Sequence, residues 1–159
     1  MLCVKRILSR LSFLLVLVAV LSSCSAHPGA HFGMASFAEV LGGGVVYSPE
    51  IKEGEQGYID GDFFALMFGE YYSFDGDYAV WLSSSLSSAE EGGAFFCDSS
   101  YSARIAAEML LERIELVENL SSAASLDVQE SFVMQLGSAV VYYYGANAEL
   151  ARRTYKEIF

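Results

Sequence analysis

Two Asp-Gly-Asp triplets, at 60–62 and 75–77, are the residues of this 159-residue sequence whose spacing most directly suggests ion binding. Alternating carboxylates begin a helix-loop-helix calcium site, which also needs an oxygen ligand at its fifth position and a glycine at its sixth. The fifth position is Phe64 for one triplet and Ala79 for the other, and neither sixth position is glycine. The triplets are therefore predicted to be a helix cap and a turn, and no metal site is expected.

Two histidines and a cysteine are the next candidates for chemistry. His27 and His31 are four residues apart and could hold a metal from one face of a helix, but Pro28 between them favours an irregular tether. Because neither histidine falls in the predicted domain, a Ser-His or Cys-His pair is not expected there. Cys97 lies in the apolar segment AFFCD and is predicted to be a small buried residue rather than a nucleophile.

Motifs of the common catalytic folds are missing from the sequence. It has no phosphate-binding loop, no dinucleotide-binding glycine pattern, no nucleophile elbow and no HExxH or CxxC pair, so no cofactor is expected. The sequence does contain 20 Asp and Glu residues, and a pair of carboxylates is enough to hydrolyse a glycoside. No such pair is singled out by its position.

The N-terminus carries the signals of export. Lys5, Arg6 and Arg10 precede an apolar run at 11–21, which is shorter than the roughly 20 residues of a membrane-spanning helix but fits a secretory signal peptide. The residues LSSC, which end at Cys24, resemble the lipobox of bacterial lipoproteins. That resemblance implies cleavage just before the cysteine and a lipid on its thiol, which would anchor the protein to the cell membrane, facing outside the cytoplasm. An ordinary signal peptide with a chance cysteine and a short uncleaved anchor are the alternatives.

Loss of the signal peptide would leave a strongly acidic chain. Without residues 1–23 the chain keeps six basic and 20 acidic residues, a formal net charge of −14. Nucleic-acid binding needs clustered Lys and Arg to neutralise phosphates, so no nucleic-acid partner is expected. With Cys24 acylated, Cys97 has no partner for an intramolecular disulfide, and the stability of the fold must come from packing.

The pattern of apolar residues predicts a single domain over 59–159 after a tether over 24–58, in which a short helix is possible near 34–41. Asp60 or Asp62 can cap the first helix of the domain. Two strands, a long helix, two further strands and a C-terminal helix follow. The strands are expected at 77–84, 92–98, 131–136 and 139–145. The long helix is expected to begin at Asp98 or Ser99 and to end near Leu120, and the last helix to run from its cap at Asn147 to the C-terminus.

The clearest local signal is a hairpin in SFVMQLGSAVVYYYG. Gly137 and Ser138 form a two-residue turn of the kind that accepts glycine first. Because side chains alternate along a strand, this turn places six side chains on one face, which is predicted to be the core face. The opposed pairs expected on it are Leu136 with Ala139, Met134 with Val141, and Phe132 with Tyr143.

Two hairpins that are each followed by a helix predict an α+β fold in the order α-ββ-α-ββ-α. The expected architecture is a four-stranded antiparallel sheet with its helices on one face. The other face would carry Tyr142 and Tyr144, and also Trp81 if the neighbours of Trp81 face the core. An open face of this kind could bind a partner or stack on sugar rings, unless residues 25–58 cover it.

Two hypotheses for function follow. The first is a non-catalytic, lipid-anchored binding module whose partner is another envelope protein or a glycan. The second is a carboxylate-dependent hydrolase acting on cell-wall polymers. The first is preferred, because nothing in the sequence selects a catalytic pair of acids.

The predicted domain contains three further patterned segments: DYAVWLSSSLSSAEEGGAFFC, SARIAAEMLLERIELVENL and GSAVVYYYGANAELARRTYKEIF. Together with the lipobox, they resemble a family of Firmicutes lipoproteins catalogued as domain of unknown function 4358, over about residues 60–159. In that family an aliphatic residue usually follows the acidic pair, whereas here Gly92 and Gly93 follow Glu91, which weakens the predicted start of the strand. The resemblance implies an envelope lipoprotein of undefined role.

Overall fold

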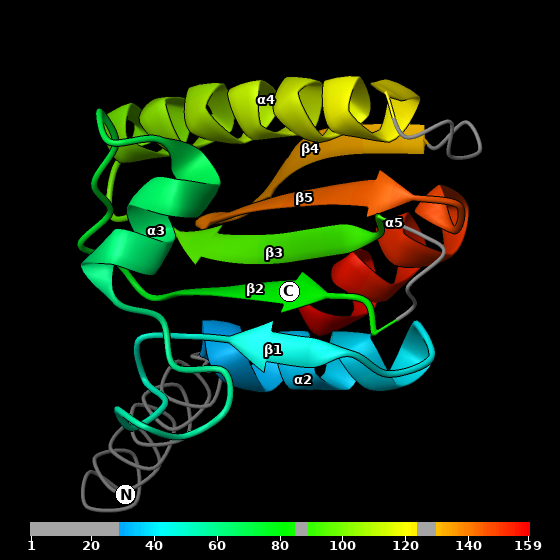
Figure 1. The fold of residues 1–159 in the computed structure, drawn as a ribbon, viewed down its shortest axis with the longest axis horizontal. Coiled ribbons are helices and arrows are strands. Elements are labelled where there is room, and N and C mark those ends of the chain that lie inside the picture. Colours follow the sequence, from blue (N-terminus) through cyan, green and yellow to red (C-terminus); the bar gives the residue numbers. More distant parts are fainter. Residues whose placement is uncertain (1–28, 85–88, 124–129) are drawn as a thin grey trace, which may run out of the picture.

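The computed structural model describes residues 29–84, 89–123 and 130–159, which form one sheet with helices on both of its faces (Figure 1). The predicted signal peptide, Cys24 and His27 lie outside the described residues, so the lipobox and the lipid anchor stay predictions. Within the described ranges, no helix is long and apolar enough to cross a membrane.

The sheet has five strands in the order β1-β2-β3-β5-β4, and each neighbouring pair is antiparallel. The strands are β1 (Val45–Tyr47), β2 (Tyr78–Leu82), β3 (Glu91–Phe96), β4 (Glu130–Leu136) and β5 (Ala139–Gly145). The α+β class is confirmed, but the predicted number of four strands is wrong. The additional strand, β1, is three residues long and follows three glycines, so it has no alternating pattern for the sequence to show.

Four helices within the described residues cover the two faces of this sheet. They are α2 (Ala30–Val40), α3 (Gly61–Phe68), α4 (Ser100–Ala123) and α5 (Ala148–Ile158). Figure 1 shows α3 and α4 in front of the sheet and α2 and α5 behind it. Each pair encloses its own cluster of buried apolar side chains against the sheet. The prediction that all helices lie on one face is therefore wrong.

The sequence of β5 shows why a second helical layer is needed. All seven residues of the strand are buried. Val141 and Tyr143 belong to the core under α2 and α5, whereas Val140 and Tyr142 belong to the core under α3 and α4. A strand that is buried on both faces reads as one continuous apolar run, and AVVYYYG is such a run.

The predicted register of the last hairpin is confirmed. Leu136 lies opposite Ala139, Met134 opposite Val141 and Phe132 opposite Tyr143. The turn between the strands begins at Gly137, whose φ of 58° is in the left-handed region that glycine adopts without strain. The side chains of these three pairs all contribute to the core under α2 and α5.

Residues 29–58 are part of the fold rather than the tether that the sequence predicts. The short helix expected near 34–41 is α2, and its Met34 and Phe37 side chains are fully buried. Phe37 stacks on Tyr155 of α5 at 4.3 Å between ring centroids and meets the edge of Trp81 of β2 at 5.6 Å. The sequence did not show that this helix belongs to the core, because the partners of Phe37 are distant in the chain. Its flanking prolines and glycines are typical of a linker, which explains the wrong prediction.

The two helices in front of the sheet begin as predicted. Asp60 accepts a hydrogen bond from the Phe63 backbone nitrogen at 2.8 Å and thereby caps α3. At the start of α4, Ser99 accepts from the Ser102 backbone nitrogen at 3.1 Å. Apolar residues that recur at helical spacing along α4 are buried; they are Ala103, Ala106, Leu110, Ile114 and Val117. The first four belong to the core between α3, α4 and the sheet.

Candidate functional site

The aromatic face predicted from the sequence is not a surface of the protein. Tyr142 and Trp81 have no exposed surface, and Tyr144 is 3% exposed. Tyr142 lies under α3, where its ring meets the edge of Phe68, whereas Trp81 lies on the opposite face of the sheet, under α2. These three side chains cannot form a docking face, because helices cover the sheet on both sides and leave them almost no exposed surface.

A buried ion pair lies on the α3 and α4 side of the sheet. Glu91, at the first position of β3, is 4% exposed and accepts two hydrogen bonds from Arg113 of α4, at 2.8 Å from Nε and 2.6 Å from Nη2. The Nη1 atom of Arg113 donates to the Met67 carbonyl oxygen at 3.2 Å, which brings in the end of α3. Burial, followed by the negative charge of Glu91, raises the pKa of Tyr142 well above its usual value. This pair joins β3, α3 and α4 from inside the core, so its role is structural.

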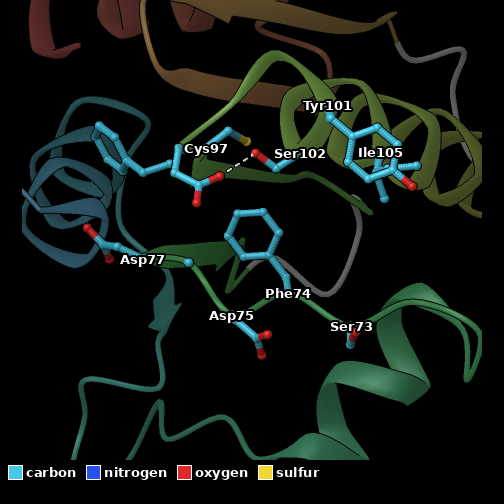
Figure 2. A pocket seen from close by; sticks show the side chains of 11 residues that line it. Ser73, Phe74, Asp75, Asp77, Cys97, Tyr101, Ser102 and Ile105 are labelled. Atoms are coloured by element: carbon cyan, nitrogen blue, oxygen red, sulfur yellow. Dashed lines mark hydrogen bonds between the residues drawn. The ribbon is translucent and has the colours of Figure 1, made fainter.

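The feature best suited to hold a ligand is a pocket of about 660 Å³ at the end of the sheet where β2 begins and β3 ends. It lies between the loop before β2, the end of β3 and the first turns of α4. Figure 2 shows the Phe74 ring pointing into the pocket, with Tyr101 and Ile105 on its other side. The remaining lining residues are Ser73, Asp75, Gly76, Asp77, Phe96, Cys97, Asp98 and Ser102. Tyr101 is 66% exposed, and the guanidinium of Arg104 lies over its ring at 5.4 Å from the centroid.

Three aspartates line this pocket, but their carboxylates do not converge. Asp98 accepts from the Ser102 hydroxyl at 2.9 Å, the bond that is dashed in Figure 2. Asp77 turns away toward α2, where it accepts from the Ala30 backbone nitrogen at 2.8 Å. Asp75 points in a third direction. The hydrolase hypothesis needs two acids on either side of one bond, and this arrangement does not provide them.

The second triplet therefore does more than turn the chain. The sequence predicts a turn at 75–77, and the structure has a bend at Gly76, just before β2. This prediction missed that Asp77 reaches the first turn of α2 and satisfies a backbone nitrogen at the start of that helix. No local signal in the sequence could have shown this, because the two residues are 47 positions apart.

Cys97 is confirmed as a small buried residue. It is 8% exposed, and its Sγ donates to the Phe95 carbonyl oxygen at 3.6 Å. Burial raises the pKa of the thiol, which keeps it protonated at neutral pH and makes it a weak nucleophile. Of the two histidines, the described one is His31 on α2, and it does not line the pocket. In the described part of the chain, no group of three or more His, Cys, Asp or Glu side chains could hold a metal ion.

No protein-family model, curated protein or solved structure matches this chain. The resemblance to the Firmicutes lipoprotein family therefore stays a prediction. What can be said of function depends on the geometry of the pocket and on the N-terminal sequence.

Proposed function

We propose that this protein is a lipid-anchored cell-envelope lipoprotein whose folded domain is a non-catalytic binding module. The apolar run and the LSSC motif support export and a lipid on Cys24. The resemblance to the Firmicutes lipoprotein family agrees with the same location. The proposal keeps the class of function suggested by the sequence but moves the binding site from Tyr142, Tyr144 and Trp81 to the pocket beside Phe74 and Tyr101.

The observation that carries the proposal is the combination of aromatic and carboxylate side chains in this pocket. Phe74 and Tyr101 contribute aromatic rings to the pocket, and such rings attract cations through their quadrupole. The Arg104 guanidinium already lies over the Tyr101 ring, 5.4 Å from its centroid, which shows that this ring attracts a cation. The carboxylates of Asp75 and Asp98 add negative charge and disfavour anions. The pocket is therefore suited to a positively charged organic group, such as an ammonium group on a small molecule or on a partner protein.

Titration followed by nuclear magnetic resonance tests this ligand chemistry. Choline is the probe, because its quaternary ammonium group is the kind of cation that aromatic cages bind. Its uncharged carbon isostere and acetate are the matched controls. We expect choline, and neither control, to shift the amide signals of Tyr101, Ser102 and Ile105, and a Tyr101→Ala variant to lose the response. Equal shifts with choline and its uncharged isostere, or no shifts at all, would refute the proposed cation site.

Intact-mass measurement of the protein purified from membranes tests the anchor. We expect the mass of a chain that begins at Cys24 and carries a diacylglyceryl group. An unmodified Cys24, or a chain that keeps residues 1–23, would overturn the anchoring half of the proposal. The titration with choline would be unaffected by that result, so the two halves can fail separately.

A further inference from the structure

The distance between the predicted anchor and the fold is short. This inference depends on the proposed function, in which Cys24 carries the lipid. Only residues 25–29 separate Cys24 from Ala30, the first residue of α2. An extended chain spans at most about 3.3–3.6 Å per residue, so the start of α2 must stay within roughly 20 Å of the anchoring cysteine.

The end of this short connection is fixed to the domain. Ala30 is fully buried, and its backbone nitrogen donates to Asp77 at 2.8 Å. The backbone nitrogen of Gly33 donates to the Gly29 carbonyl oxygen at 3.0 Å, which holds the first turn of the helix. The membrane anchor therefore acts on one defined point of the fold, and the domain cannot drift away from the bilayer without losing these contacts.

The pocket lies at the same edge of the domain as this point. Asp77, which receives the Ala30 hydrogen bond, is also a lining residue of the pocket. Figure 1 shows the N-terminal end of α2, the loop before β2 and the start of α4 on the same side of the molecule, at the left of the view. The edge nearest the anchor is therefore the edge at which the pocket opens.

The first turn of α2 also presents an exposed aromatic side chain. Phe32 is two residues after Ala30 and is 74% exposed. Phenylalanine is among the residues that helices lying at a membrane interface bury between the headgroups and the acyl chains, so a large exposed ring held this close to a bilayer can be covered by it. The carboxylates of Asp77 and Glu50 lie beside Gly29, so close that a Cβ atom at position 29 would be within 4 Å of both. Their negative charges limit how deeply this part of the protein can enter the bilayer. Such charges stay in water, so the contact is confined to the interfacial layer.

We infer that the first turn of α2 rests on the surface of the bilayer that holds the anchor, with Phe32 in the interfacial layer, so that the pocket opens beside the membrane. The ligand of the pocket is then a group presented at the membrane surface. The bilayer, rather than a partner protein, covers Phe32, because the five-residue connection holds it there whether or not a partner is bound.

A tryptophan placed at position 32 tests this orientation. The native sequence has one tryptophan, Trp81, which is fully buried and gives a constant background. The acylated Phe32→Trp protein is reconstituted in phosphatidylcholine vesicles with brominated acyl chains. We expect quenching of the added tryptophan by the brominated lipid, an emission shift to shorter wavelength, and protection from aqueous iodide.

The matched control is Leu120→Trp, near the C-terminal end of α4, where the native residue is 60% exposed. This end of α4 lies away from the start of α2 (Figure 1). This tryptophan should remain open to iodide and escape the brominated lipid. Unfolding midpoints equal to the native protein show that both variants fold. If acylated Phe32→Trp protein is quenched by iodide as strongly as the control, the orientation is wrong although the anchor stands. If Cys24 carries no lipid, both the orientation and the anchor are wrong.

Discussion

Replacing Arg113 with methionine is expected to destabilise the domain strongly. Arg113 is the partner of Glu91, whose side chain is 5% exposed, and it donates two hydrogen bonds to that carboxylate at 2.8 and 2.6 Å. Methionine keeps most of the apolar volume of arginine and removes the donors. The Glu91 carboxylate would then lie in the core between β3 and α4 without its counter-charge.

The expected magnitude follows from these contacts. Each hydrogen bond to a charged group contributes about 1.5–3 kcal/mol, and Arg113 donates two of them to Glu91. Removing one partner of a buried ion pair costs about 3–5 kcal/mol, because the other charge is left uncompensated. Domains of this size are stable by only about 5–15 kcal/mol, so the variant should unfold at a much lower urea concentration.

The chain offers a matched control in a second ion pair. Arg104 and Glu108 on α4 are 3.2 Å apart, but their side chains are 61% and 50% exposed. An exposed pair at this spacing contributes about 0.3–0.5 kcal/mol, so Arg104→Met should leave the urea midpoint nearly unchanged. Equal effects of Arg113→Met and Arg104→Met would refute the reasoning.

A double variant separates the energy of the pair from the cost of the unpaired charge. Replacing both Glu91 and Arg113 by apolar residues of similar volume removes the charge as well as its partner, and such replacements are often neutral or stabilising. We expect Glu91→Leu/Arg113→Met to be more stable than Arg113→Met alone. A double variant that is less stable than the single one would show that burial of charge does not explain the loss.

Two further predictions concern the tyrosine-rich core. Burial raises the pKa of Tyr78 and Tyr143 to about 12, whereas tyrosine in an unfolded chain ionises near pH 10. The unfolded state therefore loses these protons first as pH rises, so the contribution of the two tyrosines to the free energy of unfolding should be constant below about pH 10 and fall between about pH 10 and 12. Urea midpoints that stayed constant across pH 10–12 would contradict the argument. In Gly92→Ala, the added Cβ would lie 2.7 Å from the Tyr155 hydroxyl, which donates to the Tyr142 carbonyl oxygen at 2.8 Å. This variant should lose about 1–3 kcal/mol through overpacking, and an unchanged thermal midpoint would show that the core adjusts freely.

Elements with strong local patterns could be predicted from the sequence. The register of β4 and β5 follows from Gly137 and Ser138, because a two-residue turn leaves only one pairing that keeps large apolar side chains together. The buried stripe of α4 follows from its helical spacing. By contrast, β1 is too short to show a pattern, and the burial of α2 depends on Trp81 and Tyr155, which no local rule connects to Phe37.

The candidate site could not be assembled from the sequence for a similar reason. Its lining comes from the loop around Phe74, the end of β3 and the first turns of α4. These three segments meet because β2 and β3 are antiparallel, so that β2 begins beside the end of β3. The burial of Cys97 was predictable, because it depends on the apolar residues that immediately precede it. Its place in the wall of a pocket depends on Phe74, 23 positions earlier in the chain.

The three consecutive tyrosines of β5 show how the sequence pointed to the wrong surface. Tyrosine combines a large apolar body with a hydroxyl, so a run of them can be read either as an exposed sheet face or as a core whose hydroxyls have polar neighbours. Tyr143 accepts from the Asn147 backbone nitrogen at 3.1 Å, and Tyr142 lies beside the buried pair of Glu91 and Arg113. The Tyr143 hydroxyl is thus hydrogen-bonded, whereas the buried Tyr142 hydroxyl has no hydrogen-bond partner among the described residues. A sheet covered on both sides has no open face for a ligand. The binding that we propose is therefore placed at the ends of the strands, where the pocket lies.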